Sequence, residues 1–155
     1  TTLAGSSSGD TDATGTSASF NGPRGITTDG TNLYVTDNYN HRIRKIVIST
    51  GVVTTLAGSS SGSTDATGTS ASFYNPRGIT TDGTNLYVAD TRNCRIRKIV
   101  ISTGVVTTLA GIGCQGSTDH NTGTSASFNK PRGITTDGTN LYVADTYNHR
   151  IRKIE

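Results

Sequence analysis

Short runs of β-branched and aromatic residues alternate with runs rich in Gly, Ser, Thr and Asp along the whole chain. Between residues 23 and 58 the apolar runs predict four strands, at 25–28, 33–36, 42–48 and 52–57. The segment 29–32, Asp-Gly-Thr-Asn, has the residues that a tight hairpin turn requires. Because no window keeps an apolar spacing of 3.6 residues, we expect a chain built of strands.

The unit that contains these strands is repeated. Residues 23–58 return as 76–111 with four changes, and the unit begins a third time at residue 131 and runs to residue 155. Ile43, Ile46 and Val47 make the sheet apolar on both faces, so each sheet must pack face to face with its neighbours. Radial packing of four-stranded antiparallel sheets is a β-propeller. We therefore expect an all-β chain with blades at 23–58, 76–111 and 131–155, the last with three strands.

The two ends of the chain complement each other. Residues 1–5 read TTLAG, as do residues 54–58 and 107–111, which close the first two units. Propellers typically have four to eight blades, and an open array exposes unpaired strand edges. We expect two copies to close a six-bladed ring as a homodimer; the alternative is that the three blades belong to a longer chain. The closing ladder would join Thr1, Thr2, Leu3 and Ala4 of one copy to Arg150, Ile151, Arg152, Lys153 and Ile154 of the other.

Three short motifs now allow a family to be named. Each copy carries Pro-Arg-Gly-Ile and Asp-Gly-Thr-Asn-Leu-Tyr-Val, followed by NHRI at 40–43 and 148–151 and by NCRI at 93–96. The chain resembles the NHL repeat of β-propellers, although Arg stands where the family usually has Leu. The resemblance implies a propeller that is generally six-bladed and binds protein or RNA partners. A few similar proteins are enzymes, including a metal-dependent lyase.

Composition adds little to this interpretation. The chain has 155 residues, 31% of them apolar, with a net charge of +3, and no run is long enough to span a membrane. The basic residues recur at fixed places in each copy, which favours structural arginines. A basic face for nucleic acid is the alternative. The first two units differ at only seven of 53 aligned positions, which is typical of recent duplication or deliberate construction.

The only two cysteines belong to the second blade. Counting outward from the hairpin turn at 102–104 brings Cys94 close to Cys114. We favour a disulfide between them, which would indicate an oxidising compartment, extracellular or periplasmic. Two buried free thiols are the alternative.

Histidines recur at one position, as His41 and His149, with Cys94 at the same place in the second copy and His120 in a later loop. No HxH or carboxylate spacing accompanies them, so surface histidines are favoured over a metal site. We expect no metal and no cofactor.

Aspartates end the second strand in every copy, five residues before an arginine. The pairs are Asp37 and Arg42, Asp90 and Arg95, and Asp145 and Arg150. We expect these carboxylates to be structural ties between blades, because catalysis usually needs one differentiated constellation. No hydrolase, P-loop or Rossmann motif is present, and no catalytic residue is predicted.

The copies differ most in the loop after the second strand. Variation on a fixed frame is where recognition can reside, so this loop is the expected partner-facing surface. We expect a non-catalytic scaffold; an enzyme and a nucleic-acid binder are the alternatives. The candidate ligand-facing residues are Asn38, Tyr39, His41, Thr91, Arg92, Tyr147 and His149.

Overall fold

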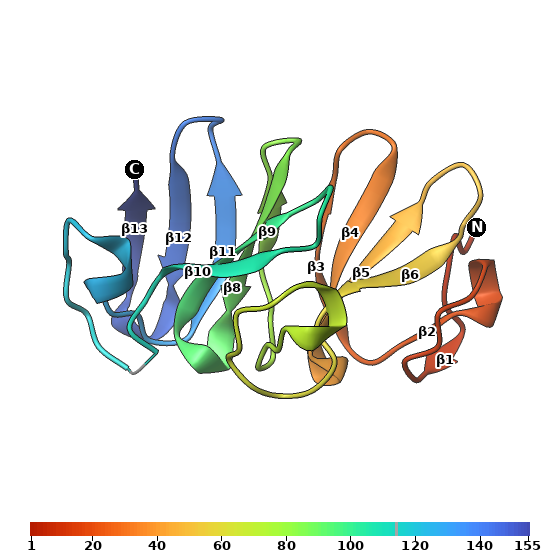
Figure 1. The fold of residues 1–155 in the computed structure, drawn as a ribbon, viewed down its shortest axis with the longest axis horizontal. Coiled ribbons are helices and arrows are strands. Elements are labelled where there is room, and N and C mark those ends of the chain that lie inside the picture. Colours follow the sequence, from red (N-terminus) through yellow and green to blue (C-terminus); the bar gives the residue numbers. More distant parts are fainter. Residues whose placement is uncertain (114) are drawn as a thin grey trace.

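The computed structural model describes residues 1–113 and 115–155. Three antiparallel sheets stand side by side, and the two termini lie at opposite ends of the array (Figure 1). Blade 1 consists of β3 (Pro23–Thr28), β4 (Asn32–Asp37), β5 (Arg42–Val47) and β6 (Val53–Ala57). Blade 2 consists of β7 (Ile79–Thr81), β8 (Asn85–Asp90), β9 (Arg95–Val100) and β10 (Val106–Ala110). Blade 3 consists of β11 (Pro131–Thr136), β12 (Leu141–Asp145) and β13 (Arg150–Ile154).

The all-β architecture and the antiparallel blades confirm the prediction from the repeats. Sequence reasoning missed the short helical turns in the polar segments and one small parallel pair, β1 (Ser7–Ser8) with β2 (Ser19–Phe20). The turns in the loops in front of the three blades are η1 (Gly15–Ser17), η3 (Gly68–Ser70) and η5 (Gly123–Ser125). Those that follow the second strand of each blade are η2 (Asn38–Asn40), η4 (Thr91–Asn93) and η6 (Thr146–Asn148). In the described part of the chain, no helix is long and apolar enough to cross a membrane.

The hairpin at Asp29 shows how the sequence fixes the first turn of a blade. Asp29 Oδ1 accepts hydrogen bonds from the backbone N–H groups of Thr31 (2.9 Å) and Asn32 (2.7 Å). Gly30 has a φ of +90°, which an L side chain rarely adopts. Asp82 and Asp137 accept the same bonds in the other blades, so the repeated segment builds the same turn in each blade.

The core lies between blades rather than inside one sheet. Tyr34 and Ile43 of blade 1 form one buried cluster with Phe73, Ile79 and Leu86 of the second repeat. A second cluster joins blades 2 and 3 in the same way. Burial of about 1.5–3 kcal/mol per large apolar side chain makes these interfaces the main source of stability.

The innermost strands approach so closely that two positions require glycine. A Cβ on Gly25 would lie 2.2 Å from the carbonyl oxygen of Arg77, and one on Gly78 would lie 2.1 Å from that of Arg132. No side chain fits at either distance, which explains the glycine of the Pro-Arg-Gly segment in the first two units.

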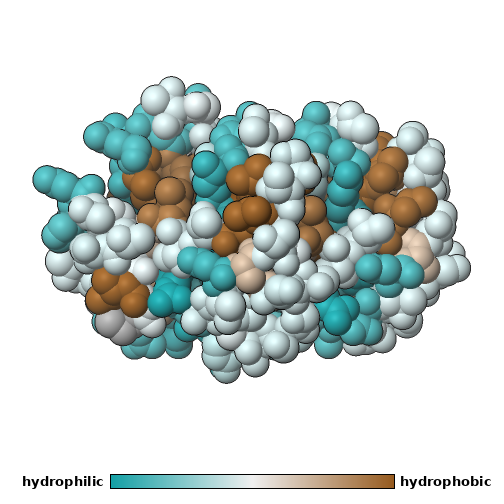
Figure 2. All heavy atoms as spheres, viewed as in Figure 1, coloured by the Kyte–Doolittle hydropathy of each residue, from teal (hydrophilic) through white to brown (hydrophobic). Residues whose placement is uncertain are grey.

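The space-filling view shows apolar side chains at the surface over all three blades, at the left, in the centre and at the right (Figure 2). Ile26 of blade 1 is 61% exposed and Ile151 of blade 3 is 75% exposed. The two ends of the array thus present the faces that are covered at the internal interfaces.

Candidate functional site

Each blade is held by a buried arginine that joins its strands to the loop in front of it. In blade 1, Arg44 Nη1 lies 2.8 Å from Asp37 Oδ2, and Arg44 Nη2 lies 2.6 Å from Asp12 Oδ1. The Arg44 guanidinium also stands 5.0 Å from the centre of the Phe20 ring. Asp37 Oδ1 accepts a hydrogen bond from the backbone N–H of Asn21 at 2.7 Å.

These contacts correct the predicted role of the strand-ending aspartates. Asp37 pairs with Arg44, and its backbone donor is in the preceding loop, so it ties its own blade to that loop rather than one blade to the next. Arg42, at the start of β5, instead reaches Asp10 in that loop, 3.0 Å away. Asp90 and Asp145 make the equivalent pairs with Arg97 and Arg152.

Burial affects the ionisation of one of these carboxylates. Burial raises the pKa of Asp90 to about 6, while hydrogen bonds from the Asn93 side chain and the Tyr74 backbone, and the charge of Arg97, act in the opposite direction. The buried carboxylate therefore depends on its donors to stay charged.

The loop aspartate also holds the outermost strand. Asp12 accepts hydrogen bonds from Thr55 of β6, from its backbone N–H at 2.9 Å and from its hydroxyl at 3.1 Å. Asp65 holds Thr108 of β10 with the same distances. Every complete blade therefore uses one carboxylate to join its third strand, its fourth strand and the preceding loop.

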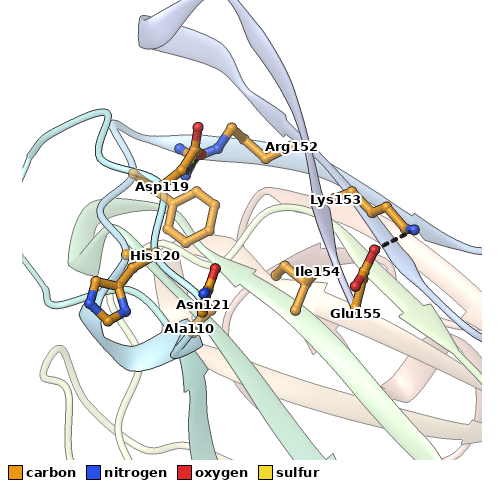
Figure 3. A pocket seen from close by; sticks show the side chains of 11 residues that line it. Ala110, Asp119, His120, Asn121, Arg152, Lys153, Ile154 and Glu155 are labelled. Atoms are coloured by element: carbon orange, nitrogen blue, oxygen red, sulfur yellow. Dashed lines mark hydrogen bonds and ion pairs between the residues drawn. The ribbon is translucent and has the colours of Figure 1, made fainter.

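Blade 3 has the carboxylate without the fourth strand. Asp119 pairs with Arg152, yet its side chain is 81% exposed, against 43% for Asp12 and for Asp65. A cavity of 350 Å³ lies beside β13, lined by Asp119, Phe128, Arg152 and Ile154 among others (Figure 3). Asp119 is the equivalent of Asp12, which binds Thr55 of β6, and Arg152 is the equivalent of Arg44, which pairs with Thr55 in the ladder of β5 and β6.

The isoleucines of the third strands show the same vacancy. Ile43 and Ile96 are fully buried, whereas Ile151 at the equivalent position of β13 is 75% exposed. On the opposite end, Ile26 is 61% exposed and its equivalent Ile79 only 6%. One face of blade 3 and one face of blade 1 are therefore exposed, although the equivalent faces of the other blades are buried between neighbouring blades.

Polar contacts also cross the interface of blades 1 and 2. The Thr36 hydroxyl donates to the carbonyl oxygen of Arg77 at 2.7 Å, across the interface of blades 1 and 2. His41 Nδ1 accepts from the backbone N–H of Asn75 at 3.1 Å across the same interface. For His149, the equivalent of His41, no such bond is found among the described residues.

The residues 1–4, expected to be a closing strand, form no strand within their own chain. Gly5 donates its N–H to Gly15 at 3.0 Å, as Gly58 does to Gly68 at 3.1 Å after β6. Residues 1–4 therefore lie against the loop in front of blade 1 in the same way that β6 lies against the loop in front of blade 2.

Five of the predicted ligand-facing residues lie together around a second cavity, of 180 Å³. They are Asn38, Tyr39, Thr91, Arg92 and Tyr147. Sequence reasoning missed the remaining members, which are Asn75, Arg77, Lys130 and Arg132. One signal was available for Asn75 and Lys130, because their equivalent in the first copy is Gly22 and the position differs in every repeat.

The histidines do not join that cavity. Burial, followed by the charge of Arg92, lowers the pKa of His41, whose ring packs edge-on against Tyr74 at 5.6 Å. His120 accepts from the backbone N–H of Thr122 at 3.0 Å. Across residues 1–113 and 115–155, no group of three or more His, Cys, Asp or Glu side chains could hold a metal ion.

Cys94 is buried and has a positive φ of 51° at the end of η4. The predicted disulfide partner, Cys114, lies outside the described residues, so the pairing stays a prediction.

The repeat motif and this geometry agree with the comparison to known proteins. The model of the NHL repeat matches residues 20–46, 73–99 and 128–154. The chain belongs to the NHL repeat family, as the sequence motifs indicated.

The chain is also similar to a curated protein and to a solved structure. It is 34% identical over 135 residues to human NHL repeat-containing protein 2, covering 79% of this chain and 19% of that protein. A crystal structure of an auxiliary nutrient binding protein from Bacteroides thetaiotaomicron superimposes with a TM-score of 0.75 and 26% identity, over 84% of this chain and 36% of that one. The chain thus spans about a fifth of that curated relative and about a third of that solved structure.

The fold also occurs in an enzyme. A catalytically inactive virginiamycin B lyase from Staphylococcus aureus superimposes with a TM-score of 0.55 at 21% identity, over 86% of this chain and 38% of that one. At this identity the likeness concerns the fold alone.

Proposed function

We propose that the chain is a non-catalytic interaction scaffold that two copies close into a six-bladed NHL ring. The observation that carries the proposal is the uncovered edge of β13, because residues 1–4 have the sequence that pairs with this edge as β6 in blade 1 and as β10 in blade 2. Thr1–Ala4 has the sequence of Thr54–Ala57, the last four residues of β6.

The ladder of blade 1 gives the register of the proposed seam. There Ile43 pairs with Ala57, Arg44 with Thr55 and Lys45 with Thr54. Transferred to the seam, Ile151 would pair with Ala4, Arg152 with Thr2 and Lys153 with Thr1 of the second copy.

This register supplies the contacts that blade 3 lacks. Thr2 is the equivalent of Thr55, so its N–H and hydroxyl would donate to the exposed Asp119. Formation of the seam would also bury Ile151 and Ile26, and the burial of each side chain would stabilise the ring by about 1.5–3 kcal/mol. Each copy would contribute residues 1–4 to one seam and the edge of β13 to the other. A half-turn that relates the two copies would therefore form two identical seams and close the ring without a free strand edge.

A disulfide trap tests both the seam and its register. In a background with both cysteines replaced by serine, the double variant Thr1→Cys, Lys153→Cys should oxidise to a two-chain species on a non-reducing gel. The matched control is Thr1→Cys, Lys45→Cys, because Lys45 occupies the same ladder position but already has Thr54 as its partner. The control should stay a single chain.

Three results would overturn the proposal. The first is equal cross-linking of both pairs, because the register would then be irrelevant. The second is a ladder of many chains, which would mean that the contact does not close. The third is no cross-link, which would favour three blades of a longer propeller.

A further inference from the structure

The 180 Å³ cavity lies where the three blades meet and is lined by cations. Arg77, Arg92, Lys130 and Arg132 line it, and no Asp or Glu does. Arg24 approaches the same group from blade 1, and burial, then the charges of Arg132 and Arg24, lower the pKa of Arg77. The side chains therefore repel one another and would gain from a shared anion.

These cations have no counter-charge in the described structure. Residues 1–113 and 115–155 contain eight ion pairs, formed by Arg42, Arg44, Arg97, Arg152 and Lys153, and none of the five cations at the cavity takes part. The Nε atoms of Arg77 and Arg132 are buried and without a hydrogen-bond partner in that part of the chain.

Tyrosine rings hold the charged groups in place. Lys130 Nζ stands 4.5 Å and Arg132 Cζ 5.4 Å from the centre of the Tyr147 ring. Arg24 stands 5.8 Å from that of Tyr39 and donates to its hydroxyl at 3.3 Å. The backbone of Arg77 is fixed by the bond that its carbonyl oxygen accepts from Thr36. The site is thus organised before any ligand arrives, which reduces the entropic cost of binding.

We propose that this cavity, the inner-end pocket, binds a small ligand that carries phosphate groups. Guanidinium groups match phosphate oxygens in a bidentate manner, and several cations suit a multiply charged anion. Drug-sized ligands usually occupy about 300–1,000 Å³, so a cavity of 180 Å³ fits a compact ionic group better. The site is complete within one chain and does not depend on the proposed ring.

Calorimetric titration with inorganic tripolyphosphate at physiological salt tests this proposal. We expect saturable binding of one ligand per chain. The double variant Arg77→Gln, Arg132→Gln should weaken it about tenfold or more, because it removes two charge-assisted donors. The matched control Lys45→Gln, Lys98→Gln removes the same charge from β5 and β9, outside the pocket, and should change the affinity less than about twofold.

Circular dichroism melts of both double variants establish that each is folded before binding is compared. A ten-nucleotide oligouridylate serves as the second probe. Absence of saturable tripolyphosphate binding, or equal weakening by the two double variants, would overturn the proposal. Binding of the oligouridylate alone would also overturn it, and would assign the cations to a nucleic-acid surface. A chain that is monomeric but binds tripolyphosphate would overturn the ring and leave the pocket standing.

Discussion

Arg44 and Asp37 form an ion pair of 2.8 Å in which both side chains are completely buried. The pair recurs as Arg97 with Asp90 at 2.9 Å. A buried pair gains little over an apolar replacement of both partners, but the loss of one partner leaves an uncompensated charge. These pairs therefore fix the position of the loop in front of each blade. The loss of one partner should strongly reduce the free energy of unfolding.

Replacing Arg97 by Met should destabilise the chain by about 3–5 kcal/mol, because Asp90 would lose its buried partner. Arg92→Met, the same change on the exposed loop of that blade, should cost less than about 0.5 kcal/mol. Urea unfolding at one fixed protein concentration measures both. A loss below about 1 kcal/mol for the first variant would contradict the structural role of the pair.

The carboxylates in the hairpin turns make the free energy of unfolding depend on pH. Burial acts to raise the pKa of Asp82, but hydrogen bonds from the Asn85 side chain and backbone, Thr84 and Tyr87 outweigh it and lower the pKa to about 2. Because this pKa lies below the ordinary value of 3.8, the stabilisation is complete above about pH 4 and is lost as the pH falls towards 2.

Asp82→Asn should therefore flatten the decline of unfolding free energy between pH 4 and pH 2, relative to the unmodified chain. Asp10→Asn, which removes an exposed carboxylate outside the turns, is the control. Urea unfolding at a series of pH values gives the slopes, and an unchanged slope for Asp82→Asn would contradict the account of the turn.

Gly133 distinguishes the proposed ring from an open array. A Cβ on Gly78 would meet a backbone oxygen at 2.1 Å, whereas the nearest atom found for one on Gly133 is the Ala144 Cβ at 3.4 Å. Gly78→Ala should cost about 1–3 kcal/mol or more through overpacking. Gly133→Ala should leave the single chain folded but dissociate the dimer, because in the ring its Cβ would meet Arg24 of the second copy. Circular dichroism and solution mass read the two effects separately, and a Gly133→Ala dimer as stable as the original would show that the proposed seam is wrong.

The sequence was informative where the structure is local and repeated. Strand positions, the turn at Asp29 and the need for glycine at Gly30 follow from residue preferences within a few positions. The same reasoning failed for Asp37, because it predicted a tie between neighbouring blades, whereas Asp37 pairs with Arg44 of its own blade and accepts a hydrogen bond from the loop in front of that blade.

Only some of the residues that line the inner-end pocket could be predicted from the sequence. Differences between copies identified the loop residues Tyr39 and Arg92, whereas Arg77 and Arg132 are the same in every copy and looked structural. Only the packing of inner strands from different blades brings these two guanidiniums together, and no single repeat contains that information.

The mass of the chain in solution tests the central claim most directly. Light scattering over a wide range of micromolar concentrations should give a constant mass of twice the 16.1 kDa chain. Ile151→Asp, which places a charge at the centre of the proposed seam, should reduce it to the mass of one folded chain. A single-chain mass for the unmodified protein, or a mass that keeps rising with concentration, would contradict the closed ring.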